Sequence, residues 1–101
     1  MIVAISISPS GADETGGVSD AVAEAVRVIR ESGLPNETNA MFTNIEGEWD
    51  EVMAVVKEAV LKVAESSPRV GLVLKADIRQ GYETGQLTAK VDRVEERLRG
   101  D

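Results

Sequence analysis

The spacing of apolar residues changes along the chain, and each change marks a different element. In residues 2–8, Val3, Ile5 and Ile7 alternate with small or polar neighbours, a period of two that predicts a strand. Apolar residues then recur at helical spacing, which predicts a helix over residues 20–32 with Ser19 as its N-cap and Gly33 at its end.

The middle of the chain predicts a hairpin followed by a second helix. Residues 36–41 and 43–48 are short extended segments that we expect to pair with each other. Asp50 is the predicted N-cap of the second helix, with Trp49 before it as a hydrophobic staple. Pro68 ends the broad apolar stripe of this helix.

The last third of the chain predicts one more strand and a terminal helix. Residues 69–78 alternate again, and a glycine-containing loop at residues 80–85 leads to Leu87, Val91, Val94 and Leu98, which have helical spacing. The predicted fold is an α+β, ferredoxin-like βαββαβ sandwich. We expect a four-stranded antiparallel sheet of order 4-1-3-2, two helices on one face and a short C-terminal helix. No repeat or linker interrupts residues 1–101, so we expect a single domain.

Composition narrows the classes of function. The net charge of −7 disfavours nucleic acid and anionic membranes as partners, because phosphate groups require a concentrated basic surface. The sequence contains no cysteine and no histidine, which excludes thiolate chemistry and the commonest general base and metal ligand. We therefore expect no metal, no cofactor and no catalysis. The apolar run at residues 2–8 is too short for a membrane span, and we expect a cytoplasmic protein.

The loop predicted at residues 9–17 contains glycines, but it lacks the Gly-Lys-Ser/Thr ending of a phosphate-binding loop. Asp13, Glu14 and Asp20 do not have the spacing of a calcium-binding loop. A plain connection between strand and helix is therefore the favoured interpretation.

Side-chain alternation predicts a mixed polar surface on the sheet face without helices. If Val3, Ile5 and Ile7 face the helices, residues of the opposite parity face away from them. This uncovered face would gather Ser6, Asn44, Glu46, Lys75 and Asp77, whereas Thr43 would lie on the helix side. Two interpretations remain: a solvated or subunit-interface surface with a Lys75–Glu46 or Lys75–Asp77 ion pair, or a polar pocket for a small ligand. The apolar Ile2 and Val73 on the same face favour self-association.

The segment from Met41 to Met53, MFTNIEGEWDEVM, resembles the small thiamine-binding protein family, which was long catalogued as uncharacterised. Members have a similar Met-x-Thr-x-Ile-Glu-Gly stretch before the second helix. Pro9 and Gly11 resemble the end of the family's first strand, and residues 73–79, VLKADIR, resemble its last strand. This resemblance covers nearly the whole chain. It implies a ferredoxin-like fold, homodimers or homotetramers, and non-catalytic binding of thiamine or its hydroxymethylpyrimidine fragment.

Carried over position by position, the resemblance implies that Met41, Thr43, Glu46 and Asp77 bind the ligand. An aminopyrimidine offers an amino donor beside ring-nitrogen acceptors, and carboxylates, amides and hydroxyls complement these groups. The complete predicted site therefore also includes the side chains of Ser6, Asn44 and Lys75. Phe42 stands where the family often has a small residue, so it would narrow the pocket or stack in it.

Two other functions remain open at this stage. The first is a structural or regulatory homo-oligomer without a small ligand, whose interface is the uncovered sheet face. The second is an enzyme that uses carboxylates, hydroxyls or Lys75 as a base. Binding of thiamine or a related pyrimidine is the favoured prediction.

Overall fold

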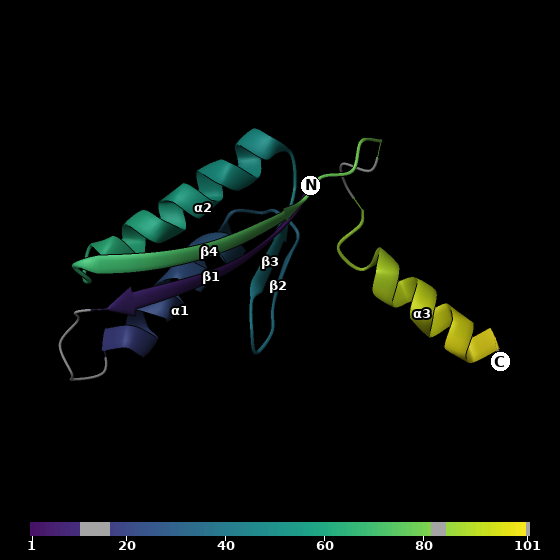
Figure 1. The fold of residues 1–101 in the computed structure, drawn as a ribbon, viewed down its shortest axis with the longest axis horizontal. Coiled ribbons are helices and arrows are strands. Elements are labelled where there is room, and N and C mark those ends of the chain that lie inside the picture. Colours follow the sequence, from purple (N-terminus) through teal and green to yellow (C-terminus); the bar gives the residue numbers. More distant parts are fainter. Residues whose placement is uncertain (11–16, 82–84, 101) are drawn as a thin grey trace.

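The structure is a computed structural model that describes residues 1–10, 17–81 and 85–100. Four strands and three helices follow one another in the predicted order (Figure 1). They are β1 (Ile2–Ser10), α1 (Gly17–Glu31), β2 (Asn36–Thr38), β3 (Thr43–Glu46), α2 (Trp49–Ala64), β4 (Arg69–Asp77) and α3 (Ala89–Gly100).

The sheet has the order β2-β3-β1-β4 with every neighbouring pair antiparallel, which confirms the predicted topology. The two neighbours of β1 differ in length. Strand β3 pairs with β1 only from Ile2 to Ile5, whereas β4 pairs with it from Ile2 to Ser10. Beyond Ile5, β1 therefore pairs, among the described strands, with β4 alone.

The core lies between the sheet and helices α1 and α2. Val3 and Ile5, which alternate toward the helices as predicted, are buried, and Ile45 joins them from β3, whereas Ile7 is only partly buried. Each helix buries a stripe at helical spacing. The buried members are Ala21, Ala25 and Ile29 in α1, and Val52, Val56, Ala59 and Val63 in α2. Burial of these aliphatic side chains supplies the main driving force for folding.

Three predicted boundaries are wrong. Helix α1 begins at Gly17, so Ser19 lies inside it and is not its N-cap. Helix α2 begins at Trp49 with Glu48 as N-cap, and the Glu48 N–H donates to the Glu51 carboxylate over 3.2 Å. The Glu51 carboxylate, three residues after the N-cap, accepts the N-cap N–H, so the helix does not use Asp50 as its cap. The Trp49 side chain is 54% exposed and lies within the helix, so it is no staple before it.

The first strand is longer than predicted and the hairpin strands are shorter. Strand β1 continues through Pro9 to Ser10 because β4 pairs with it along its whole length. Proline is tolerated there because this end of β1 has no β3 neighbour. Strands β2 and β3 include only 36–38 and 43–46 of the extended segments predicted at 36–41 and 43–48.

Helix α3 projects away from the sandwich (Figure 1) and buries none of its residues. Its apolar residues Val91, Val94 and Leu98 are therefore exposed. Among the described residues, no helix is both long enough and apolar enough to cross a membrane.

Gly33, just after α1, has a φ of +82°, in the left-handed region that glycine adopts without strain. We expect Gly33→Ala to lower the free energy of unfolding by about 1 kcal/mol, measured by urea denaturation. Gly100→Ala is the matched control, because Gly100 lies in a helix with open space around it and does not have a positive φ. An equal effect of the two substitutions would contradict this account of the turn.

Candidate functional site

A cavity of about 180 Å³ lies between α1, β1 and the hairpin formed by β2 and β3, and we call it the hairpin cavity. Its wall is mainly apolar on the α1 side and more polar on the hairpin side. The lining residues are Ile5, Ser6, Ile7, Val22, Ala25, Val26, Ile29, Thr38, Asn39, Ala40, Met41, Phe42 and Thr43. Three predicted site residues therefore meet in one place: Ser6, Met41 and Thr43.

The cavity forms where β3 separates from β1. The last pair between these strands is Ile5 with Thr43, so the hairpin tip no longer covers β1 from Ser6 onward. None of the described strands pairs with this stretch of β1 on the cavity side, so its backbone groups there can bind a polar ligand.

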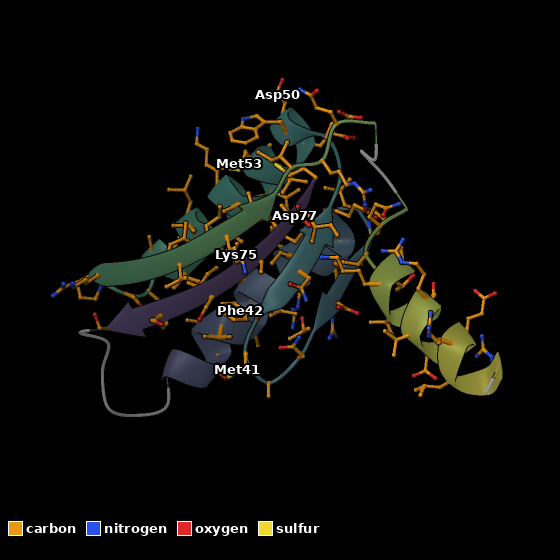
Figure 2. All side chains as sticks on the ribbon, turned by 45° about the vertical axis from the view of Figure 1, so that its right-hand side comes forward. Met41, Phe42, Asp50, Met53, Lys75 and Asp77 are labelled. Atoms are coloured by element: carbon orange, nitrogen blue, oxygen red, sulfur yellow. The ribbon has the colours of Figure 1, made fainter. Side chains whose placement is uncertain are left out.

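Asn39 shapes the hairpin tip. Its Oδ1 accepts hydrogen bonds from the N–H groups of Met41 and Phe42, each 2.9 Å long, and its own N–H donates to the Phe42 carbonyl over 2.9 Å. Asparagine often closes turns in this way, with its side chain bound to nearby backbone. The turn places Met41 and Phe42 near α1 at the rim of the cavity (Figure 2). Met41 is exposed and Phe42 is half-buried.

A pair of threonine hydroxyls forms the polar end of the cavity. Oγ1 of the buried Thr43 lies 3.1 Å from Oγ1 of Thr38. One hydroxyl donates to the other, and the accepting hydroxyl keeps its own hydrogen for another partner. The pair therefore presents both a donor and acceptor positions beside an apolar wall.

The remaining predicted residues lie on the sheet face that α1 and α2 do not cover, which we call the open face. The register sets Ile2 between Glu46 and Asp77, and Ala4 between Asn44 and Lys75. These cross-strand neighbours lie on the face that side-chain alternation predicted for them. Figure 2 shows Lys75 and Asp77 on β4. The sheet separates this group from Thr43, so the seven predicted residues do not form one pocket.

Partners on the open face differ from those predicted. The Asn44 Nδ2 donates to the Glu37 carboxylate over 3.2 Å. Within the described part of the chain, Lys75 forms no ion pair with Glu46 or Asp77. The register explains this difference, because Lys75 is level with Ala4 whereas both carboxylates are level with Ile2.

Glu46 is 2% exposed, and its carboxylate binds the segment that leads to α3. Oε2 accepts the Gln86 N–H at 2.7 Å, and Oε1 accepts the Leu87 N–H at 3.2 Å. Hydrogen bonds to a charged acceptor compensate in part for the cost of burying it. A small pocket of about 30 Å³ lies beside this contact, lined by Ile2, Asp77, Arg79, Gln86 and Lys90.

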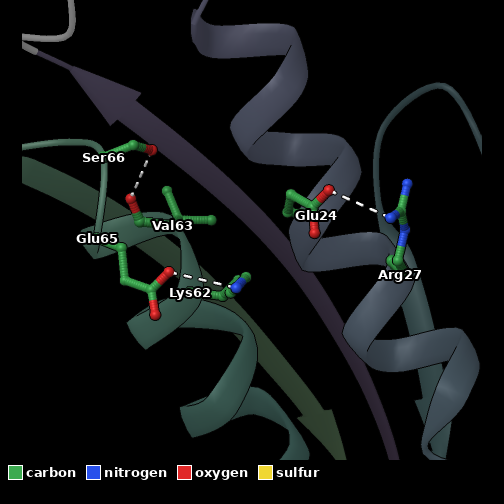
Figure 3. A network of polar contacts seen from close by, with 6 residues as sticks. All are labelled: Glu24, Arg27, Lys62, Val63, Glu65 and Ser66. Atoms are coloured by element: carbon green, nitrogen blue, oxygen red, sulfur yellow. Dashed lines mark hydrogen bonds and ion pairs between the residues drawn. The ribbon is translucent and has the colours of Figure 1, made fainter.

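The surface between α1 and α2 has a different character. Two local ion pairs lie here: Glu24–Arg27 at 3.4 Å within α1, and Lys62–Glu65 at 3.3 Å between α2 and its C-cap residue (Figure 3). Exposed pairs of this kind contribute little to stability. Of the acidic residues tested above for a calcium site, Asp13 and Glu14 lie outside the described residues. Among the described residues, no three potential ligands from histidine, cysteine, aspartate and glutamate come close enough to hold a metal.

Comparison with known proteins identifies the family to which the chain belongs. The thiamine-binding protein family matches residues 3–95. The chain belongs to this family, which confirms the resemblance found in its sequence. A UPF0045 protein of Mycobacterium bovis is 54% identical over 99 residues, covering 97% of this chain and 94% of the relative. A UPF0045 protein of Methanocaldococcus jannaschii is 37% identical over 83 residues, covering 82% of this chain and 81% of the relative.

Solved structures of similar proteins share the fold. The crystal structure of a hypothetical protein from Methanocaldococcus jannaschii matches with a TM-score of 0.79 and 35% identity, covering 94% of this chain and 95% of that chain. A Thermotoga maritima protein assigned provisionally to thiamine biosynthesis or salvage matches with a TM-score of 0.78 and 27% identity, covering 92% and 96%.

The buried position of Glu46 leads to a test of its structural role. Glu46→Ala removes the acceptor of two backbone N–H groups, so we expect the free energy of unfolding to fall by about 2 kcal/mol in urea titrations. Hydrogen exchange at the Gln86 and Leu87 amides should accelerate at the same time. Glu58→Ala, at an exposed position of α2, is the control and should change neither quantity appreciably. Unchanged exchange at both amides would show that Glu46 does not hold this segment.

Proposed function

We propose that this protein binds thiamine or a compound with the same hydroxymethylpyrimidine group, without catalysing a reaction, and that the pyrimidine ring occupies the hairpin cavity. The observation that carries the proposal is the hydroxyl pair of Thr38 and Thr43 at one end of an apolar cavity, in a member of the thiamine-binding protein family. The relative from Thermotoga maritima, with its provisional place in thiamine metabolism, supports the same class of ligand.

The size of the cavity supports entry of one ring rather than of a whole vitamin. Pockets that enclose a drug-sized ligand usually measure about 300–1,000 Å³. The hairpin cavity measures about 180 Å³, which suits a single substituted pyrimidine. The second ring of thiamine would then lie at the rim near the exposed Met41.

The hydrogen-bonding groups of the cavity complement an aminopyrimidine. Its amino group needs an acceptor and its ring nitrogens need donors. The threonine hydroxyl pair supplies both kinds of group, and the unpaired β1 edge at Ser6 and Ile7 supplies backbone groups on the adjoining wall. Val22 and Val26 of α1 offer apolar contacts for the ring face.

Charge favours the cationic ligand over its phosphates. The thiazolium ring of thiamine is positively charged, and the protein carries a net charge of −7, so the long-range field attracts the cation and repels added phosphate groups. Met41 has a polarisable thioether at the rim that can pack against the thiazolium ring.

The roles proposed for the seven predicted residues now differ. We propose that Ser6, Met41 and Thr43 contact the ligand. Because the sheet separates Thr43 from Glu46, a ring in the hairpin cavity does not contact Asn44, Glu46, Lys75 or Asp77. The absence of catalysis remains part of the proposal, supported by a sequence without histidine or cysteine.

Self-association to a homodimer or homotetramer also belongs to the proposal. The exposed apolar residues of α3, which are Val91, Val94 and Leu98, support it, and so does the exposed Val73 on the open face of β4. Apolar side chains gathered in this way commonly mark protein–protein contacts.

The test is a thermal-shift and calorimetric titration with thiamine, its phosphates and hydroxymethylpyrimidine. Ligand at 100 times its Kd should raise the free energy of unfolding by about 2.7 kcal/mol. Thr43→Val keeps the shape of the side chain but removes the hydroxyl, and it should weaken binding about tenfold. Val26→Phe, which fills the cavity from α1, should abolish binding while the protein remains folded.

Lys75→Ala and Asn44→Ala are the matched controls, because both residues lie on the open face and line no part of the hairpin cavity. Binding lost in these variants but retained in Thr43→Val would move the site to the open face. No stabilisation by any of the compounds would favour the alternative function, a structural or regulatory homo-oligomer without a small ligand.

A further inference from the structure

A second cavity, of about 130 Å³, lies beside the start of α2, where β1 begins and β4 ends, and we call it the Trp49 cavity. Three segments far apart in the sequence meet there: the start of the chain, the turn into α2 and the residues that follow β4. Its lining includes Met1, Glu48, Trp49, Ile78, Arg79 and Gln80. Among the described residues, none lines both this cavity and the hairpin cavity, so the two sites are separate.

The apolar wall of the Trp49 cavity includes large side chains that the fold leaves exposed. Trp49 is 54% exposed and Ile78 is 62% exposed, whereas Met1 is buried. The Met1 carbonyl accepts the Gly47 N–H over 3.1 Å, which holds the start of the chain at this end of the sheet. Pockets that bind small molecules usually combine apolar and aromatic walls with a few polar groups.

The volume of the Trp49 cavity sets the size of the apolar group that it can hold. An apolar cavity of about 150 Å³ in a protein interior holds a molecule of the size of benzene. The Trp49 cavity, at about 130 Å³, therefore suits a branched aliphatic group of about four carbon atoms.

Charged groups of opposite sign line the same cavity from different segments. Glu48 belongs to the turn into α2, whereas Arg79 and Gln80 belong to the segment after β4. The Glu48 carboxylate accepts the Glu51 N–H in the capping box, and a carboxylate has further acceptor positions for an ammonium group. A guanidinium group binds a carboxylate through two parallel hydrogen bonds.

We propose that the Trp49 cavity binds a free amino acid with an aliphatic side chain, such as leucine. The side chain of this ligand packs against Trp49 and Ile78. Its ammonium group binds the Glu48 carboxylate, and its carboxylate binds the Arg79 guanidinium and the Gln80 amide. The two charges of one small molecule thus meet the two charged sides of one cavity.

A zwitterion fits the charges of this cavity better than an ion of one sign. The first turn of α2 adds Asp50 and Glu51 beside Glu48, and these carboxylates repel an isolated anion. Arg79 in turn repels an isolated cation. A molecule that carries both charges has an attractive partner for each of them.

The first test uses Trp49, the single tryptophan of the sequence, whose fluorescence reports on this cavity. We expect leucine to change the emission of Trp49 saturably, because the ligand covers an indole that is now exposed to solvent. Three analogues each lack one part of leucine: glycine lacks the side chain, isopentylamine lacks the carboxylate and isocaproate lacks the ammonium group. Each analogue should bind at least tenfold more weakly than leucine. The absence of a saturable change with leucine would overturn the proposal, as would equally tight binding of any analogue.

The second test removes one charge at a time. Arg79→Gln and Glu48→Gln each keep a polar side chain, and we expect each to weaken leucine binding at least tenfold. Arg69→Gln and Glu58→Gln are the matched controls, because both residues are exposed and neither lines the cavity. Circular dichroism checks that each variant is folded, and the analogues test the unmodified protein if one is not. Leucine binding that both cavity variants retain, or that the controls lose equally, would refute the assignment.

The amino-acid site does not rest on the ligand proposed for the hairpin cavity. Arg79→Gln should be stabilised by thiamine as strongly as the unmodified protein, since Arg79 does not line the hairpin cavity. Leucine binding without stabilisation by thiamine would support the Trp49 cavity and contradict the function proposed above. A saturable change of Trp49 emission with thiamine but not with leucine would contradict both assignments.

Discussion

The unequal pairing of β1 determines most of what this molecule presents to its surroundings. Strand β4 accompanies β1 for nine residues, but β3 accompanies it only to Ile5. The hairpin tip therefore lies clear of β1, and the space between them becomes the hairpin cavity, closed on the third side by α1. The same long pairing extends β4 into an edge of nine residues. A longer β3 would fill the cavity with its own side chains and backbone.

Glu46 illustrates how a short motif can be recognised correctly while its role is not apparent. The resemblance selects this residue as a ligand contact, yet its two oxygens accept the N–H groups of Gln86 and Leu87. A buried carboxylate with two backbone donors is costly to remove but already has its partners. Its position fixes where Gln86 and Leu87 lie before α3 begins. Among the described residues Glu46 is the most buried acidic one, and it anchors the segment that leads to α3, a helix without buried residues.

Much of the architecture follows from periodicity because burial acts on one face of each element. The alternation of Val3 and Ile5, and the stripe of α2, predict the strands, the core and the parity of Thr43 against Glu46. Helix starts are less predictable, because several acidic residues near Trp49 compete for the cap and the geometry of Glu48 and Glu51 decides among them. The hairpin cavity was beyond prediction, since it depends on where pairing with β1 stops. The contact of Glu46 with Gln86 spans 40 residues and leaves no periodic signal.

The sheet separates the two proposed sites. The hairpin of β2 and β3 stands at one side of the sheet and β4 forms the opposite edge, with β1 between them. The hairpin cavity lies beside the tip of that hairpin, whereas the Trp49 cavity lies where β1 begins and β4 ends. Since no described residue lines both cavities, neither ligand contacts the other's site directly. Coupling between two sites requires that a ligand distinguish two states of the structure that connects them. Within one chain that connection is the sheet itself, in which β1 pairs in one register with β3 and in one register with β4.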